Sequence, residues 1–142
     1  MFDYMRKAQY HETDQMGIIH HANYVKWMEE ARVAYLTNIG FGYRKMEELG
    51  VVSPVTGISL DYLKPVRFDD DVRIRLTIRR YTGVVLEFSY EFLDVTTGEV
   101  STRAVSRHCF LKGNRPVSLK RTLPEVDALI RVQEESEQTT IR

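Results

Sequence analysis

The 142-residue sequence predicts an α+β fold in which one long helix lies across the apolar face of an antiparallel sheet of about five strands. Three patterns support this prediction. Apolar residues recur at spacings of three and four after Asn23, which is the period of a helix with one buried face. After Gly50 the period changes to two, and turn residues separate the alternating runs, as in strands. A sheet with one apolar face needs a cover, and this helix carries the only wide apolar stripe.

The N-terminal part of the chain is expected to hold the first strand and the long helix. Residues 3–11 have an extended pattern. The helix should begin at Asn23, whose side chain suits an N-cap, and it should end before Gly40 and Gly42. Its apolar stripe consists of Tyr24, Trp27, Met28, Ala31 and Tyr35. A second, short helix is predicted from about Tyr43 to Leu49.

Four further strands are predicted after residue 50, arranged as a meander. The runs "GISLDYLKP", "VRIRLTIRRY" and "VVLEFSYEFLDV" alternate between apolar and polar residues, and a fourth strand extends from about Val100 to Leu111. The apolar faces of the three runs consist, in order, of Ile58, Leu60 and Tyr62; of Ile74, Leu76 and Ile78; and of Leu86, Phe88, Tyr90 and Phe92.

The register of the middle two strands can also be predicted. A turn centred on Gly83 would set Arg79 opposite Glu87 and Arg75 opposite Glu91. Opposite charges that face each other across two strands favour this antiparallel pairing, although each pair contributes only about 0.2–1 kcal/mol.

Composition limits the classes of function. One domain is expected over residues 1–132, followed by a polar, frayed tail from Gln133 to 142. The 20 basic and 20 acidic residues balance, so no overall positive field favours nucleic acid, and no apolar run predicts a membrane span. The single Cys109 excludes an internal disulfide framework. The sequence therefore predicts a cytoplasmic protein whose low net charge fits an oligomer.

The segment "YHETDQMGIIHHANYVKWMEEAR", residues 10–32, gathers ionisable residues directly before the long helix. Asp14 lies in a short loop, and Gly17 allows a backbone conformation that a side chain would forbid. The free N–H groups at a helix N-terminus suit a developing negative oxygen. A carboxylate beside such donors could carry out acyl transfer, by attacking or by activating water. Alternatively, Asp14 only stabilises a turn through contacts with its own backbone.

The adjacent histidines His20 and His21 leave other kinds of site to consider. No further ligand stands at a convincing spacing, so a metal site is not favoured. A structural histidine or one that faces substrate is the preferred interpretation. A phosphate-binding loop is not supported, because neither GxGxxG nor GxxxxGK[ST] occurs. A Ser-His-Asp arrangement stays open, although no G-x-S-x-G elbow supports it.

The same segment resembles the 4-hydroxybenzoyl-CoA thioesterase family, and within it the small acyl-CoA thioesterases of the bacterial Tol–Pal cluster. Their pattern is similar to "Y-x-E/D-T-D-x-x-G-V-V-Y-H-A-N-Y-x-x-W/F-x-E-x-A-R". Two later segments, "DYLKPVRFDDDV" and "SRHCFLKGNRPVSL", also resemble the family, so the likeness spans about residues 4–123. The resemblance implies a hot-dog fold, in which the sheet wraps round a central helix, and a homodimer or homotetramer with active sites at the subunit interface.

The resemblance also implies roles for individual residues. Asp14 matches the catalytic carboxylate, as nucleophile or general base. His21 lies where a backbone N–H polarises the thioester carbonyl, and its side chain matches a family histidine. Gly17 shapes the loop. Asn23 and Tyr24 fix the helix start and the pocket wall. His20 replaces the usual tyrosine and is a candidate contact with the substrate, so the acyl preference is not implied.

Coenzyme A is expected as part of the substrate, and no separate cofactor is predicted. Its phosphates require basic side chains, and the arginine fork suits phosphate oxygens. The candidates are Arg79 and Arg80, followed by Lys64 and Arg67. Outward arginines on a strand are also common without any ligand.

The sequence thus predicts an acyl-CoA thioesterase that releases a carboxylic acid and free coenzyme A. Two alternatives stay open: a hot-dog dehydratase acting on acyl groups of a carrier protein, and a module that binds acyl-CoA or a partner protein without turnover. The acyl group is not specified by the sequence.

Overall fold

The computed structural model describes the backbone of residues 1–141 and the side chains of residues 1–137. Its elements are, in chain order, β1 (Phe2–Lys7), the 3₁₀ helix η1 (Tyr10–Glu12), α1 (Asn23–Asn38), α2 (Tyr43–Glu48), β2 (Val51–Val52), β3 (Val55–Tyr62), β4 (Asp71–Tyr81), β5 (Val85–Asp94), β6 (Val100–Cys109), β7 (Leu111–Lys112), β8 (Arg115–Pro116), α3 (Leu119–Thr122) and α4 (Pro124–Ile141). Both predicted N-terminal helices are therefore present.

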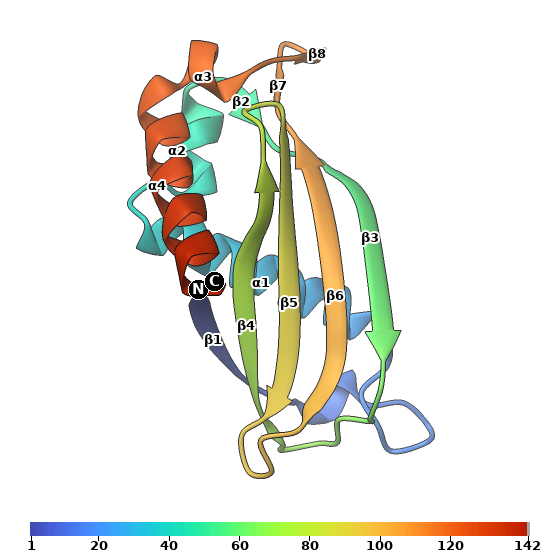
Figure 1. Ribbon diagram of the computed structural model, residues 1–142. Coiled ribbons are helices and arrows are strands. Elements are labelled where there is room, and N and C mark those ends of the chain that lie inside the picture. The colour runs from blue at the N-terminus through green and yellow to red at the C-terminus, as the bar shows by residue number, and fades with distance from the viewer. Residues whose placement is uncertain (142) are drawn as a thin grey trace.

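Five strands form one antiparallel sheet in the order β1-β4-β5-β6-β3, and this sheet curves around α1 (Figure 1). In this view α1 lies behind the sheet, while α2, α3 and α4 gather at its upper left. A second, small sheet joins β2, β7 and β8. The predicted architecture, five antiparallel strands wrapped around a long helix, is confirmed.

The predicted meander is wrong for its first strand. β3 pairs with β6, and β4 pairs instead with β1 and β5. The segment 63–70 passes below the ends of β6 and β5 and carries the chain to the start of β4 (Figure 1). Only β4, β5 and β6 are joined by short turns, so the pairing of β3 is non-local and leaves no signal between neighbouring runs.

The core lies between α1 and the concave face of the sheet. Trp27, Met28 and Ala31 on α1 are fully buried, and the apolar faces predicted for β4 and β5 are buried against them. The face predicted for β3 is different, because Ile58 is 39% exposed and Tyr62 is 48% exposed. β3 is an edge strand, so α1 does not cover this part of the sheet.

The register of β4 and β5 is as predicted at Arg75, which lies opposite Glu91. It shifts by one residue farther along, because a bulge between Ile78 and Arg80 places Arg80 rather than Arg79 opposite Glu87. The predicted turn holds, since Gly83 has φ +91°, a conformation that favours glycine.

The predicted start of the long helix and the predicted C-terminal tail both need correction. The residue that precedes α1 is Ala22, and Asn23 is the first helical residue rather than a side-chain N-cap. The amide Nδ2 of Asn23 instead donates a hydrogen bond to the carbonyl oxygen of Glu12 at 2.8 Å. The expected frayed tail from Gln133 continues α4 as far as Ile141, and Arg142 lies outside the described residues.

A buried carboxylate explains why this segment is helical. Glu137 is 2% exposed and accepts hydrogen bonds from the Tyr35 hydroxyl and from the Ile78 N–H. These contacts fix α4 against α1 and β4. A polar composition was therefore a poor guide to the state of this segment.

Candidate active site

The loop between η1 and α1 is a short, closed turn. Thr13 and Ile19 form an antiparallel bridge, and the Asp14 N–H donates to the Ile18 carbonyl oxygen at 2.9 Å. The Gly17 N–H donates to the Asp14 carbonyl oxygen at 3.0 Å. Gly17 has φ +77°, so a glycine suits this turn, as predicted from the sequence.

The carboxyl group of Asp14 both stabilises this turn and lines a cavity. Its Oδ1 accepts a hydrogen bond from the Met16 N–H at 2.8 Å, which is an Asx turn. Asp14 is half-buried and belongs to the lining of a cavity of about 320 Å³. The two interpretations offered for this residue are therefore compatible, because one oxygen can hold the turn while the other serves the cavity.

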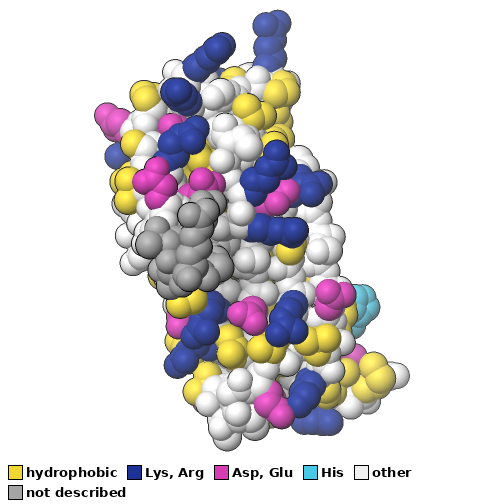
Figure 2. Space-filling view, viewed as in Figure 1, with side chains coloured by type: hydrophobic (Ala, Val, Ile, Leu, Met, Phe, Trp, Pro, Cys, Tyr) yellow, Lys and Arg dark blue, Asp and Glu magenta, His cyan; other side chains and the backbone are white. Residues whose placement is uncertain are grey.

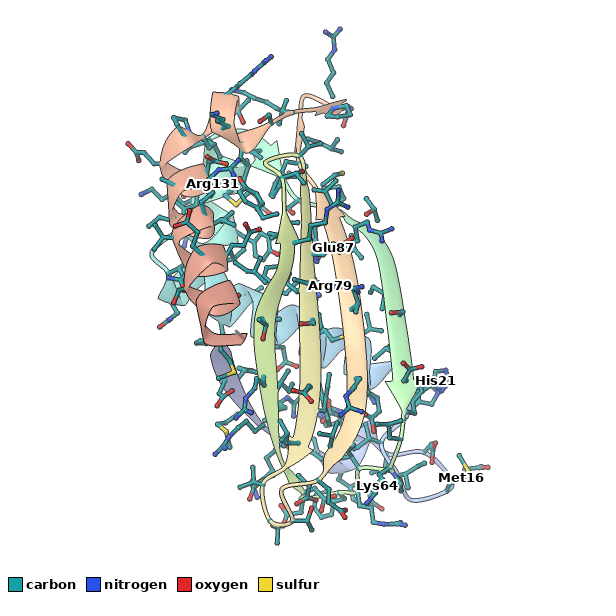
Figure 3. All side chains as sticks on the ribbon, in the orientation of Figure 1. Met16, His21, Lys64, Arg79, Glu87 and Arg131 are labelled. Atoms are coloured by element: carbon teal, nitrogen blue, oxygen red, sulfur yellow. The ribbon has the colours of Figure 1, made fainter. Side chains whose placement is uncertain are left out.

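This cavity, named here the Asp14 cavity, lies between the loop, the start of α1 and the end of β3. Figure 3 shows His21 and Lys64 near the lower end of β3, and Met16 projecting from the loop. The lining residues are Asp14, Met16, Ile18, Ile19, His21, Tyr24, Tyr62, Leu63, Lys64 and Pro65. Of the residues predicted for the site, Asp14, His21, Tyr24 and Lys64 therefore meet here, and Gly17 shapes the loop beside them.

The head of α1 supplies one free hydrogen-bond donor at this cavity. Within residues 1–141, the N–H of His21 donates to no hydrogen-bond acceptor. The N–H of Ala22, by contrast, donates to Nδ1 of His20 at 3.2 Å. His20 thus satisfies part of the helix start, and its ring stacks on that of His21 with centroids 4.2 Å apart. It does not line the cavity, so its predicted contact with substrate has no support within one chain.

Two tyrosines form a wall of the cavity. The Tyr62 hydroxyl donates to the carbonyl oxygen of His21 at 3.1 Å, which ties the end of β3 to the head of α1. Its ring meets that of Tyr24 edge to face, with centroids 5.1 Å apart. Burial raises the pKa of Tyr24, so this hydroxyl stays protonated at neutral pH. The predicted role of Tyr24 as a wall residue agrees with this position.

Glu12 supports the loop from below, and the sequence prediction did not single it out. It is 4% exposed, and its Oε2 accepts hydrogen bonds from Arg6 Nη2 and from Trp27 Nε1, both at 2.8 Å. Its Oε1 accepts one from the Gln9 N–H at 2.9 Å. The carbonyl oxygen of the same residue binds the His20 N–H. Glu12 thus connects β1, the loop and α1. The only sequence signal for this role was Arg6 on the preceding strand, a possible partner for its charge.

The predicted phosphate contacts are not all close to this cavity. Lys64 lines it and forms an ion pair of 2.7 Å with Glu99. Arg67 is exposed on the neighbouring segment and bridges Ile18 through its backbone. Arg79 and Arg80 lie on β4, outside the lining of the cavity, so one chain does not bring them to it.

The outward face of the sheet offers a local explanation for Arg79. Its Nε is 3.9 Å from Oε2 of Glu87, while Arg107 Nε donates to Oε1 of the same carboxylate at 2.9 Å. Figure 3 shows Arg79 and Glu87 together about midway along the sheet. Figure 2 shows basic and acidic side chains interleaved over this face. The pairing gives Arg79 a role without any ligand.

No group of three or more His, Cys, Asp or Glu side chains within the described part of the chain could hold a metal ion. Among the helices of residues 1–141, none combines the length and the apolar character that crossing a membrane requires.

The curved antiparallel sheet around one helix and the loop before that helix belong to a family that the sequence identifies. Residues 8–130 match the Thioesterase-like superfamily, and the chain belongs to this family. The hot-dog fold and the enzyme class, a thioester hydrolase, are thereby confirmed.

Individual relatives support the same class. The chain is 37% identical over 121 residues to the putative acyl-CoA thioesterase YneP of Bacillus subtilis, covering 84% of this chain and 87% of that protein. It is 33% identical over 127 residues to a putative esterase of Aquifex aeolicus, covering 88% and 96%. The structure of a DHNA-CoA thioesterase from Staphylococcus aureus superposes with a TM-score of 0.90 at 30% identity, covering 96% of this chain and 93% of that one.

Proposed function

We propose that the protein hydrolyses an acyl-CoA thioester in the Asp14 cavity, releasing a carboxylic acid and coenzyme A. One observation carries the proposal: the carboxyl group of Asp14 and the unpartnered N–H of His21 belong to two residues that line the same cavity. The relatives named as acyl-CoA and DHNA-CoA thioesterases supply the class of substrate.

In the proposed reaction the thioester carbonyl oxygen accepts a hydrogen bond from the His21 N–H. The positive end of the α1 dipole favours the negative charge that develops on this oxygen. Asp14 either attacks the carbonyl carbon or takes a proton from an attacking water molecule. If Asp14 attacks, the C–S bond breaks to leave an acyl anhydride on Asp14, which water then hydrolyses to the acid and the free carboxylate. If Asp14 activates water, the water oxygen adds directly and the C–S bond then breaks. By both routes the thiolate of coenzyme A leaves and is protonated, and one water molecule is consumed.

The proposed site is completed by a second copy of the chain. β3 is at the edge of the sheet, and its outer side has no strand partner among the described residues. Val55, Ile58 and Tyr62 are each exposed by 39–48% along this strand. A copy related by a twofold axis can add its own β3 in antiparallel direction and cover these side chains. We propose such a dimer, with a tetramer formed from two dimers as the larger assembly.

The finer assignments are part of the same proposal. The motif in residues 10–32 supports the 4-hydroxybenzoyl-CoA type, and within it the Tol–Pal-cluster type, of thioesterase. The likeness to a DHNA-CoA thioesterase supports an aromatic acyl group. Lys64 is the preferred contact for a phosphate of coenzyme A, since it is the predicted basic residue that lines the cavity. A cytoplasmic location and the lack of a separate cofactor stay predictions from the sequence.

The test is the release of coenzyme A thiol from a panel of acyl-CoA substrates by the wild-type protein and by Asp14→Asn. The amide keeps an oxygen for the Met16 N–H, so folding should be unchanged, while turnover should fall by about 100-fold or more. Asp3→Asn, on β1 and 39% exposed at its side chain, is the matched control and should keep full activity. Near-normal hydrolysis by Asp14→Asn would refute the role of this carboxylate, and binding of coenzyme A without any turnover by the wild type would favour a binding module.

A further inference from the structure

The start of α1 lacks an ordinary capping side chain. Ala22 precedes the helix with helical backbone angles, φ −67° and ψ −22°, and its methyl group cannot accept a hydrogen bond. The first N–H groups of a helix have no acceptor within the helix and need one elsewhere. The imidazole of His20 supplies one, because its Nδ1 accepts from the Ala22 N–H at 3.2 Å. A side chain of the preceding loop therefore takes the place of the missing cap.

Two successive peptide groups at this point differ in their hydrogen bonds. The group that joins His20 to His21 accepts from the Asn23 N–H at its carbonyl oxygen, at 3.0 Å. Its own N–H, that of His21, is the donor without an acceptor within residues 1–141. The next group, which joins His21 to Ala22, is held at both ends. Its carbonyl oxygen accepts from the Tyr62 hydroxyl at 3.1 Å, and its N–H donates to His20 Nδ1.

This second peptide group limits the direction of the free donor. The two peptide planes share the α-carbon of His21, and only the two backbone dihedral angles of that residue relate them. Holding the second plane from both sides therefore restricts the first plane, which carries the His21 N–H. A donor for a developing oxyanion must be aimed accurately, because a misplacement of about 1 Å in an active site can lower the rate by about 100-fold.

The ring of His20 is itself held in place, although the residue is exposed. Its backbone N–H donates to the Glu12 carbonyl oxygen at 2.8 Å. Its ring stacks on that of His21, with an angle of 29° between the ring planes. Nδ1 accepts a hydrogen bond only when it carries no proton, so the ring acts in its neutral form with the proton on Nε2. His21 lines the Asp14 cavity and His20 does not, which separates the two histidines by role.

We propose that His20 and Tyr62 are positioning residues, which hold the His21–Ala22 peptide group so that the His21 N–H is aimed at the thioester oxygen. This inference rests on the proposed function. Both side chains act through the peptide group rather than on the substrate. At position 20 the required property is an acceptor at the place of Nδ1, and the aromatic ring is not required. At position 62 the required property is the hydroxyl group.

Two substitutions of His20 separate the acceptor from the ring. His20→Asn keeps an acceptor, since Oδ1 is bonded to Cγ as Nδ1 is, and asparagine is a favoured capping residue. His20→Phe keeps a ring that can stack but has no acceptor. Thiol release from benzoyl-CoA and from hexanoyl-CoA, measured over a range of concentrations, gives kcat and KM. His20→Asn should keep kcat within about 3-fold, whereas His20→Phe should lower kcat by about 10-fold to 100-fold with KM unchanged.

Tyr62→Phe tests the other end of the same peptide group. It keeps the ring beside Tyr24 and removes the hydroxyl, and it should lower kcat by about 5-fold to 10-fold with KM unchanged. In the variant that combines it with His20→Phe, kcat should fall by less than the product of the two single effects, because both side chains act on one group. His11→Phe, at an exposed histidine of η1, is the control and should keep both kcat and KM.

The outcomes separate this inference from the proposed function. Wild-type protein that hydrolyses neither thioester contradicts the proposed function. Where the wild type is active, a normal kcat in folded His20→Phe shows that His20 only caps the helix, and it overturns the inference alone. A loss of kcat in His20→Asn as large as that in His20→Phe also overturns it, because the ring then matters. If His20→Phe does not fold, an unchanged kcat in Tyr62→Phe overturns the inference, and so does a loss of about 10-fold or more in His20→Asn.

Discussion

The buried carboxylate of Glu12 gives a prediction whose magnitude can be worked out from the structure. Substitution of Glu12 by Gln keeps the shape of the side chain but replaces one oxygen with an NH₂ group. Both oxygens of Glu12 accept from N–H donors, which belong to Arg6, Gln9 and Trp27. Whichever way the new amide is turned, its NH₂ group faces at least one of these donors.

At least one of the three hydrogen bonds is therefore lost, and the ion pair with Arg6 loses its negative partner. A hydrogen bond to a charged group contributes about 1.5–3 kcal/mol, and an unpaired buried charge adds to the loss. Arg6 is 18% exposed at its side chain and keeps Glu30 as a second partner at 3.1 Å, which limits the cost. We expect Glu12→Gln to lower the free energy of unfolding by about 2–4 kcal/mol.

Urea denaturation followed by tryptophan fluorescence measures this change, since Trp27 is the single tryptophan and itself contacts Glu12. Glu30→Gln removes the other carboxylate partner of Arg6, at a side chain that is 37% exposed, and should cost less than about 1 kcal/mol. A destabilisation by Glu12→Gln that is no larger than that of Glu30→Gln would refute the reasoning. Turnover of the remaining folded Glu12→Gln protein should also fall, because the same residue fixes the loop before α1.

Two further predictions concern pH and assembly. The folded pKa of His108, about 4, lies below its ordinary value of 6.5, so stability that is present above pH 6.5 should be lost as the pH falls toward 4. The free energy of unfolding should fall by about 3 kcal/mol over this range. Urea titrations at several pH values measure the change, and His108→Gln should make the free energy of unfolding depend less on pH. An equally steep decline in the variant would contradict the prediction. At the exposed edge of β3, Ile58→Lys should convert the proposed dimer to a monomer in analytical ultracentrifugation. It should also lower turnover by about 100-fold or more, because the proposed site needs both copies. Val132→Lys, on α4 and 60% exposed, should leave both unchanged, and a dimeric or fully active Ile58→Lys protein would count against the proposed interface.

The parts of the fold that depend on local patterns were predictable. The alternation in β4 and β5 gave the buried face correctly, and the charge pair of Arg75 and Glu91 gave their register. The spacing of Trp27 and Met28 gave the buried face of α1. These signals are local because helix and strand periods act on neighbouring residues, and a hairpin joins strands that are adjacent in sequence.

The features that were missed depend on distant partners. The pairing of β3 with β6 joins Val55 to His108, which are far apart in the chain, and no turn records it. The bulge at Arg79 and the helical state of Gln133 depend likewise on tertiary contacts. For the candidate site, the position of Asp14 beside the start of α1 could be predicted because its loop and this helix are contiguous in sequence.

The burial of Arg32 was harder to predict from the sequence. Its position on α1 is that of an ordinary helical arginine, and only the packed structure shows that it is buried and donates to the Tyr90 hydroxyl. Its polar neighbours Tyr90, Ser106 and His108 come from two other strands, so their proximity is a property of the folded sheet. Sequence patterns do not contain this information.

The segment 63–70, which carries the chain beneath the sheet, has a consequence for the effect of insertions and deletions. Leu63, Lys64 and Pro65 line the Asp14 cavity, and the next residue, Val66, accepts a hydrogen bond from the Ile19 N–H at 2.7 Å. The segment 63–70 thus continues directly from the edge strand β3 and is hydrogen-bonded to the loop that carries Asp14. Lengthening or shortening this segment by one residue would therefore change the wall of the Asp14 cavity and displace the loop that carries Asp14 at the same time.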